Sequence, residues 1–104
     1  MVEVVKYGAT GRRKSSIARV NIVPGTGMIR VNKRTFENYF CRETDRIMIL
    51  EAFKVTNTLG KFDVEASITG GGSSGQAGAF RLGLSRALTL SDPENKSILR
   101  KSEF

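Results

Sequence analysis

The sequence predicts a single small domain of the α/β class, in which strands and helices share one hydrophobic core. Residues 62–69 alternate apolar and polar side chains, the period-two pattern of a strand with one buried face. From about residue 74 to residue 90, apolar side chains recur at three- and four-residue steps, which is typical of an amphipathic helix. A chain of 104 residues can bury one modest core but not a second, so we expect residues 1–104 to form one domain.

The first third of the chain is expected to contain three strands. Residues 2–7 suggest a short strand, and residues 8–14 a loop, because they include two glycines and end in three consecutive cations. Residues 15–23 return to a strand pattern, and residues 24–27 have the composition of a turn. Ala18, Val20 and Ile22 lie on one side of this strand, and the other side carries Ile17, Arg19, Asn21 and Val23. Residues 28–32 then form the return strand, which predicts a hairpin with the strand before the turn.

Helices are expected in the segment between residue 35 and the strand at residues 62–69, and again near the end of the sequence. Thr35 is a suitable N-cap for a helix whose aromatic residues, spaced i, i+3 and i+4, indicate core packing rather than a base-stacking platform. Those aromatic residues are Phe36, Tyr39 and Phe40. A helix over residues 43–53 is expected to turn inward Ile47, Leu50 and Met48. The run Asp92-Pro93-Glu94 predicts the start of a last helix, which would dock through Ile98 and Leu99.

The residue types exclude most catalytic chemistry. The chain has no histidine and one cysteine, so neither a zinc site nor a Ser–His or Cys–His nucleophile is expected. The ten acidic residues are scattered, which disfavours an enzyme and gives no reason to expect a cofactor or a small-molecule substrate. Cys41 follows two aromatic residues and is expected to be a buried small hydrophobe. A single cysteine also fits a reducing, cytosol-like compartment. Neither a signal peptide nor an apolar run of roughly 18 residues, the length of a membrane span, is recognisable.

The positive charge is concentrated in one segment. The net charge is +7, and between Val4 and Phe36 there are eight basic residues and no acidic one. These eight are Lys6, Arg12, Arg13, Lys14, Arg19, Arg30, Lys33 and Arg34. An acid-free run of this length indicates a polyanionic partner. Nucleic acid is favoured over a membrane, because no helix places bulky apolar residues opposite these cations.

A glycine-rich turn lies between the strand at residues 62–69 and the long helix. Glycines before a helix N-terminus allow an anion or a backbone to come close, and the helix dipole favours negative charge there. Gly70-x-Gly72-x-x-Gly75 matches the dinucleotide-binding pattern, but a second helix follows where that fold needs a parallel strand. Gln76 also stands where a phosphate-binding loop requires lysine, so a nucleotide-binding module is a minor alternative. Gly78 and Gly83 predict close packing of another backbone, either a strand of this protein or an RNA strand.

The residues around this turn resemble a known family. The resemblance is carried by Gly70-Gly71-Gly72-x-x-Gly75-Gln76-x-x-Ala79-x-x-x-Gly83-x-Ser85-Arg86-Ala87-Leu88. Upstream, the resemblance continues in the basic opening Thr10-Gly11-Arg12-Arg13-Lys14-Ser15-Ser16, in Ala18-Arg19-Val20 and in Pro24-Gly25-x-Gly27. Together these motifs are similar to the family of ribosomal protein nine of the small subunit, bacterial type, over nearly the whole chain.

The resemblance implies a non-enzymatic protein that binds small-subunit rRNA in the head of the subunit, beside neighbouring ribosomal proteins. It implies a two-layer fold, with a mixed, mostly antiparallel four-stranded sheet and helices on one face. The rRNA contacts implied by matching motifs are Arg12, Arg13, Lys14, Arg19, Gly71, Gly72, Ser73 and Gln76. Further contacts, expected from charge and position alone, are Lys33, Arg34, Arg81 and Arg86.

Members of this family also carry a long basic tail that reaches tRNA in the peptidyl site. The sequence ends at Phe104, just where that tail would begin, so no residue here is assigned to the tRNA contact. The expected location is cytoplasmic, on a ribosome of bacterial or organellar type. An extraribosomal RNA-binding role remains an alternative at this point.

Overall fold

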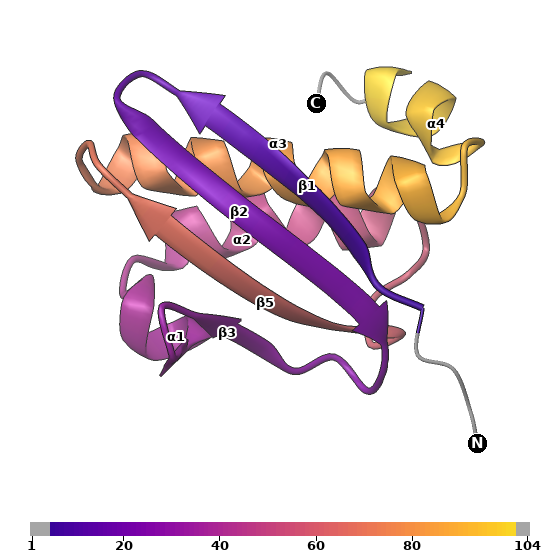
Figure 1. The fold of residues 1–104 in the computed structure, drawn as a ribbon, viewed down its shortest axis with the longest axis horizontal. Coiled ribbons are helices and arrows are strands. Elements are labelled where there is room, and N and C mark those ends of the chain that lie inside the picture. Colours follow the sequence, from indigo (N-terminus) through magenta and orange to yellow (C-terminus); the bar gives the residue numbers. More distant parts are fainter. Residues whose placement is uncertain (1–4, 102–104) are drawn as a thin grey trace.

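The computed structural model describes residues 5–101, except for the side chains of residues 73, 74 and 101. Within that range the chain forms a five-stranded sheet and four helices (Figure 1). In chain order they are β1 (Tyr7–Arg13), β2 (Ser16–Pro24), β3 (Ile29–Val31), β4 (Arg34–Thr35), α1 (Phe36–Tyr39), α2 (Glu43–Val55), β5 (Phe62–Thr69), α3 (Ser73–Ser91) and α4 (Asn95–Lys101). None of the helices described is long and apolar enough to cross a membrane.

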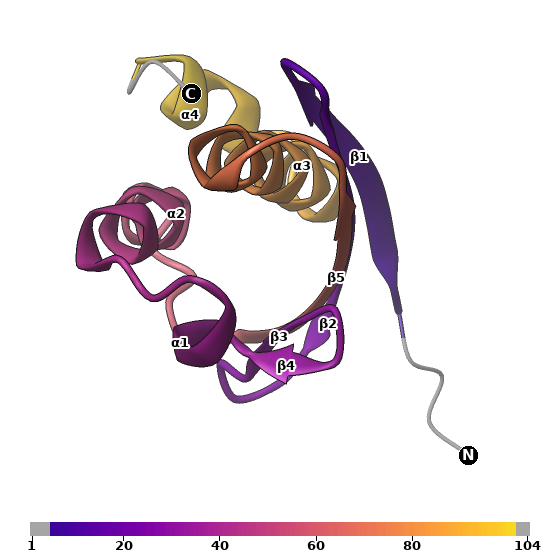
Figure 2. The same ribbon diagram turned by 90° about the vertical axis from the view of Figure 1, so that its left-hand side faces the viewer.

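The elements form two layers, as the resemblance implied. Figure 2 shows the four helices on one side of the curved sheet, and no helix of the described residues covers its other face. The strand order is β1-β2-β5-β3-β4, and neighbouring strands are antiparallel except for the parallel pair β3–β5. The α/β class and the mostly antiparallel sheet are therefore confirmed. The sheet has five strands rather than four, because β4 adds a two-residue strand at its edge.

The predicted hairpin between residues 15–23 and 28–32 is wrong, because β5 lies between these two strands. β2 pairs antiparallel with β5 from Ile17 to Pro24, and β3 pairs with the far side of β5. β3 has three residues, whereas β5 offers eight that alternate strictly, so the longer pair satisfies more backbone groups and buries a wider apolar face. Two-residue hairpin turns occur instead at residues 14–15 and 32–33.

The segment at residues 8–14, predicted to be a loop, lies almost entirely in β1. Gly11 is buried, and a Cβ at this position would overlap the carbonyl oxygen of Ala79 and the amide nitrogen of Gly83 in α3. A Cβ on Gly83 would in turn lie 2.8 Å from Cγ2 of Val20. The glycines therefore let a helix backbone lie on a strand backbone and do not form a turn. For Gly83 the packing partner is a strand of this protein. Residues 2–4 of the predicted first strand lie outside the described residues.

The short aromatic helix agrees with its prediction. Oγ1 of Thr35 accepts a hydrogen bond from the Asn38 amide at 3.3 Å and caps α1. The Phe36 and Phe40 rings are buried, and the Phe40 ring stacks on that of Phe80 with centroids 5.9 Å apart. These rings join α1 to α3, which confirms the core role expected of this stripe.

Two side-chain predictions near α2 are wrong. The buried residues of α2 are Ile49, Ala52 and Phe53, whereas Ile47 is 51% exposed. Met48 and Leu50 are partly buried against the core as expected, so only Ile47 of the predicted inward set is wrong. Cys41 is exposed rather than buried, because the chain turns outward after Phe40, whose ring takes the position in the core.

The last helix starts at Asn95, two residues later than the predicted first helical residue, Pro93. Oδ1 of Asp92 accepts a hydrogen bond from the Glu94 amide at 3.1 Å, so Asp92 stabilises a turn that precedes α4. The buried Asn95 then donates from Nδ2 to the Leu88 carbonyl at 2.9 Å and fastens α4 to α3. Leu99 docks the helix as expected, but Ile98 is 40% exposed.

Asp63 anchors the loop that carries the chain from β2 across the end of β5 to β3. Its Oδ1 accepts hydrogen bonds from the amides of Thr26, Gly27 and Met28 at 3.0, 3.1 and 3.0 Å. These bonds stabilise the carboxylate, the bond from Met28 most strongly, and they lower the pKa of Asp63 below its ordinary value of 3.8. A Cβ on Gly25 would overlap the same carboxylate, so a residue with a side chain does not fit at this position.

The lowered pKa of Asp63 predicts a pH-dependent contribution to stability. Because the folded state favours the ionised carboxylate, the contribution is complete above the unfolded pKa and is lost as the pH falls through the lower folded pKa. Asp63→Asn should therefore lower Tm at pH 7, and the difference from the wild type should shrink below about pH 4. Thermal unfolding between pH 7 and pH 2 measures this, and a difference that stayed constant would contradict the assignment.

The contact at Gly11 predicts a strong effect of a single methyl group. Gly11→Ala should reduce the free energy of unfolding by at least about 2 kcal/mol, because backbone atoms of α3 occupy the space of the new Cβ. Gly72→Ala is the control, since no atom lies within 4 Å of a Cβ there, and we expect a change within about 0.5 kcal/mol. Equal losses in denaturant titrations of the two variants would refute this explanation.

Candidate nucleic-acid interface

The tip of the β1–β2 hairpin lies against the glycine turn that precedes α3. Gly70 and Gly71 have φ angles of +77° and +67°, which favour glycine. A Cβ on Gly70 would overlap the Ser15 carbonyl, and one on Gly71 would overlap Oγ of Ser16. The buried Ser16 donates from Oγ to the Gly70 carbonyl at 2.9 Å. The hairpin tip therefore fills the space beside Gly70 and Gly71, and an anion can approach this turn only from the side of Gly72 and the first amides of α3.

Gln76, expected to contact RNA, is hydrogen-bonded within the protein. Its Nε2 donates to the Gly70 carbonyl at 3.1 Å, and its Oε1 accepts from the Tyr39 hydroxyl at 2.8 Å. That hydroxyl accepts in turn from Nδ2 of Asn32 at 3.2 Å, and the Asn32 amide also pairs with both backbone groups of Ile68. Gln76 thus fixes the glycine turn to α1 and to the end of β3.

The N-terminus of α3 is left open to an anion. Its N-cap is Gly72, which provides no side-chain hydrogen bond, and its first turn contains no acidic residue. The first intrahelical hydrogen bond runs from the Gln76 amide to the Gly72 carbonyl at 2.9 Å, so the preceding amides of the helix have no partner within it. The dipole of this 19-residue helix adds positive potential at the same place. Ser73 is the first residue of the helix, and its side chain is outside the described part.

The predicted cations at the hairpin tip point in different directions. Arg12 and Arg19 lie on the uncovered face of the sheet, where they are diagonal neighbours on β1 and β2. Arg13 points to the helix side, and a Cβ on Gly78 would lie 2.9 Å from its Nε. Lys14 is exposed in the turn itself, with a φ angle of +54°. The hairpin tip thus places cations on both sides of the sheet beside the N-terminus of α3.

The cations expected from charge alone are more dispersed. Lys33 is exposed in the β3–β4 turn. Arg34 bonds to Asn38, and its guanidinium lies 5.6 Å from the centroid of the Tyr39 ring. Arg81 is half-buried on α3, and Arg86 donates from Nη1 to the Thr10 carbonyl at 2.7 Å, so it stabilises the outer edge of β1. The structure therefore brings the hairpin tip with Arg12, Arg13 and Lys14 against the glycine turn and Gln76, whereas Arg34 is linked to Gln76 only through Tyr39 and Arg86 lies along β1.

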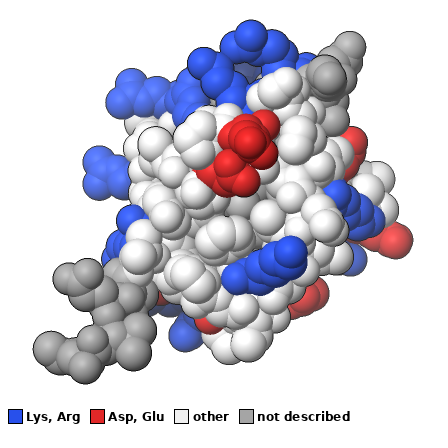
Figure 3. Space-filling view, turned by 90° about the vertical axis from the view of Figure 1, so that its right-hand side faces the viewer, with Lys and Arg blue, Asp and Glu red and all other residues white. Residues whose placement is uncertain are grey.

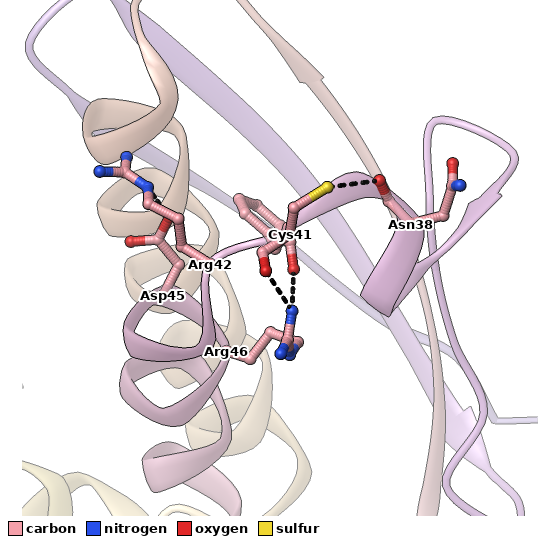
Figure 4. A network of polar contacts seen from close by, with 6 residues as sticks. Asn38, Cys41, Arg42, Asp45 and Arg46 are labelled. Atoms are coloured by element: carbon pink, nitrogen blue, oxygen red, sulfur yellow. Dashed lines mark hydrogen bonds and ion pairs between the residues drawn. The ribbon is translucent and has the colours of Figure 1, made fainter.

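The cations of the acid-free segment are not neutralised within the described part of the chain. Residues 5–101 contain an ion pair between Arg42 and Asp45 at 3.3 Å, and none from that segment to a described carboxylate. Figure 4 shows this pair beside Arg46, which donates from Nη1 to the carbonyls of Phe40 and Cys41 at 2.7 and 2.8 Å. Arg42 and Arg46 thus organise the α1–α2 connection, whereas the hairpin-tip cations are available for a partner.

The far end of the molecule has a different charge pattern. In Figure 3, which faces that end, basic side chains lie along the upper and left borders and also near the centre, and acidic side chains lie among them in the upper middle and at the right-hand edge. Among the described residues no group of three or more His, Cys, Asp or Glu side chains could hold a metal ion. The unneutralised cations of the hairpin tip, next to the N-terminus of α3, are therefore the best candidate binding surface.

Three residues that support the site were not predicted from the sequence. Ser16, Asn32 and Tyr39 contact no predicted ligand, but their hydrogen bonds hold the glycine turn. Asn32 offered a weak signal, since asparagine tolerates the positive φ angle, here +49°, that such a two-residue turn requires. Ser16 and Tyr39 gave no such signal, because the bonds that tie them to Gly70 and Gln76 join residues more than 30 positions apart in the chain.

The fold and the site together define a small α/β protein with a cationic surface suited to nucleic acid. Residues 11–104 match the family described as Ribosomal protein S9/S16. The chain is also 46% identical over 99 residues to "Small ribosomal subunit protein uS9" of Syntrophobacter fumaroxidans (strain DSM 10017 / MPOB), which covers 95% of this chain and 76% of that relative. The chain therefore belongs to the ribosomal protein S9/S16 family. Proteins of this family are structural components of the ribosome, so the prediction of a non-enzymatic protein is confirmed.

The hydrogen bonds around Tyr39 predict a measurable stability effect. Tyr39→Phe removes a hydroxyl that bridges Asn32 and Gln76, and it should lower the free energy of unfolding by about 1 kcal/mol. Tyr7→Phe is a matched control, because no hydrogen bond of the Tyr7 hydroxyl is formed in the described part of the chain. If both variants unfolded at the same denaturant concentration, the bridging role of Tyr39 would be disproved.

Proposed function

We propose that this chain is a structural component of the small ribosomal subunit and binds rRNA in the head of the subunit through the hairpin tip and the N-terminus of α3. The observation that carries the proposal is the position of unneutralised cations beside an uncapped helix N-terminus. Phosphate is attracted both by guanidinium and ammonium groups and by free backbone amides. Family membership supports rRNA as the polyanion and other ribosomal proteins as neighbours.

The residues of the site divide into two roles. Arg12, Arg13, Lys14 and Arg19 contact rRNA phosphates, and Gly72 with Ser73 brings the backbone of α3 close to the RNA. The open space at Gly72 supports this approach, since nothing lies within 4 Å of a Cβ there. Gly71 and Gln76 act from behind this surface by holding the turn. Such phosphate contacts position the protein, and the shape of the folded RNA provides selectivity.

The place of action is the ribosome of a bacterial cytoplasm, as the bacterial relative supports. A contact with tRNA in the peptidyl site stays a prediction and involves no residue of this sequence. Sedimentation of the purified protein with small subunits distinguishes the ribosomal role from an extraribosomal one, in which the protein would bind RNA but remain in the free fraction.

The proposal predicts a steep salt dependence that can be traced to particular residues. Each phosphate neutralised on a duplex contributes about 0.9 to the slope of log K against log salt concentration, and about 0.7 on a single strand. Arg12→Ala with Arg13→Ala should therefore make the slope of binding to small-subunit rRNA shallower by about 1.4 to 1.8. Filter-binding titrations between about 50 and 200 mM salt measure this slope.

The matched control removes the same charge elsewhere. Lys54 and Lys61 are exposed and lie outside the proposed interface, so Lys54→Ala with Lys61→Ala should leave the slope nearly unchanged. An equal reduction in both double variants would show that only net charge matters, and it would contradict the proposed location. Wild-type binding that did not respond to salt would refute the phosphate contacts altogether.

A further inference from the structure

The uncovered face of the sheet contains a concavity that shares only Arg19 with the proposed phosphate contacts. It is formed where β2, β5 and the β3–β4 turn meet, and its volume is about 460 Å³. Its polar lining consists of Arg19, Asn21, Asn32, Lys33, Glu65 and Ser67. The volume falls in the range of roughly 300–1,000 Å³ typical of small-ligand sites, which is enough for one nucleoside. No helix of the described residues covers this face (Figure 2).

The strand register places the charged groups of this concavity in two rows. Glu65 lies between Asn21 on β2 and Arg30 on β3. In the next row Arg19 stands opposite Ser67, and the bonds of Asn32 to Ile68 bring Lys33 to the same end of β5. Register partners on one face have Cβ atoms about 4.5–5.5 Å apart. The carboxylate of Glu65 is therefore surrounded by cations and amides on a single surface.

Glu65 forms no ion pair with these cations. Neither Arg19 nor Arg30 lies within 4.0 Å of its carboxylate, although both are on adjacent strands. Asn21 and Ser67 likewise form no side-chain hydrogen bond with another described residue. Asn32 is the exception, since its amide is bound to Ile68. Most polar groups of the concavity are thus free to bind an external partner.

An acidic side chain on a phosphate-binding surface is unfavourable unless it meets a donor. A carboxylate repels phosphate, but its two oxygens accept hydrogen bonds from base edges. Guanine offers two parallel donors on its Watson–Crick edge, N1–H and the N2 amino group, which match the two oxygens of a carboxylate. Single-stranded segments of folded RNA present this edge unpaired, and proteins read it there. The amide of Asn21 and the ammonium group of Lys33 can donate to O6 of the same base.

We propose that this concavity binds one unpaired guanine of rRNA, with Glu65 accepting from its Watson–Crick edge and with Arg19 and Lys33 on the flanking phosphates. This inference rests on the proposed rRNA binding and goes beyond it. The contacts proposed above reach only the phosphate backbone of the RNA, whereas this one recognises a particular base. Ser67 lies beside Glu65 and can bond to the ribose 2′-hydroxyl.

The sign of one charge change tests the proposal. Glu65→Gln removes a negative charge, so binding to polyanionic RNA should become tighter if Glu65 only repels phosphate. If Glu65 reads guanine, the amide group of glutamine opposes one base donor and binding should become about tenfold weaker. Glu51→Gln is the matched control, because Glu51 is exposed on α2 and lies outside the concavity. This substitution removes the same charge as Glu65→Gln. Its affinity should stay the same or rise slightly.

A footprint on full-length small-subunit rRNA locates the contact. A dicarbonyl reagent that modifies N1 and N2 of unpaired guanines should leave one guanine protected by the wild type and by Glu51→Gln, but modified with Glu65→Gln. Tighter or unchanged binding of Glu65→Gln, or a footprint that it shares with the wild type, would overturn the proposal. A protein segment in the concavity would give that same unchanged footprint. Failure of the wild type to bind the rRNA at all would instead refute the proposed function.

Discussion

The contact between the backbones of β1 and α3 at Gly11 determines how the interface is built. With no side chain between them, the helix lies directly on the strand, and Gly83 repeats the close approach against Val20. The axis of α3 is thereby fixed along the β1–β2 hairpin. Its N-terminus must then fall beside the hairpin tip, where Gly70 and Gly71 pack on the residues of the turn. A packing constraint in the core thus places a helix dipole next to the cations.

The glycine-rich motif is therefore mainly a structural device. Gly70 and Gly71 adopt positive φ angles and fit against Ser15 and Ser16, and Gln76 bonds back to the turn. From the sequence, these residues were expected to let a ligand come close to the backbone. In the structure, most of them contact other residues of the same protein instead. Rigid support is what a backbone-binding surface requires, because free amides bind an anion well only when their orientation is fixed in advance.

Local patterns were predicted well, and long-range pairing was not. β5, α3 and the Thr35 cap follow from neighbouring residues, whose spacing alone defines a strand, a helix or an N-terminus. The prediction of a β2–β3 hairpin was wrong because strands that follow one another in sequence need not pair. β5, which begins 38 residues after the end of β2, is longer than β3 and pairs with β2 in its place. Gly11 was assigned to a loop because glycine in a strand and glycine in a turn look alike in sequence. The site residues came from charge and from the family resemblance, and their support from Tyr39 could not be seen in either.

Two acidic residues on β5 show why position matters more than residue type on this face. Asp63 and Glu65 are two residues apart on one strand, so their side chains leave the sheet on the same side. Three backbone amides of the β2–β3 loop donate hydrogen bonds to Asp63, whose role is therefore to stabilise that loop. Glu65 has no such partner, although cations flank it, and its charge opposes the binding of phosphate. A surface selected for phosphate alone gains nothing from a free carboxylate at its centre. The acid is explained if the surface also meets the donors of a base.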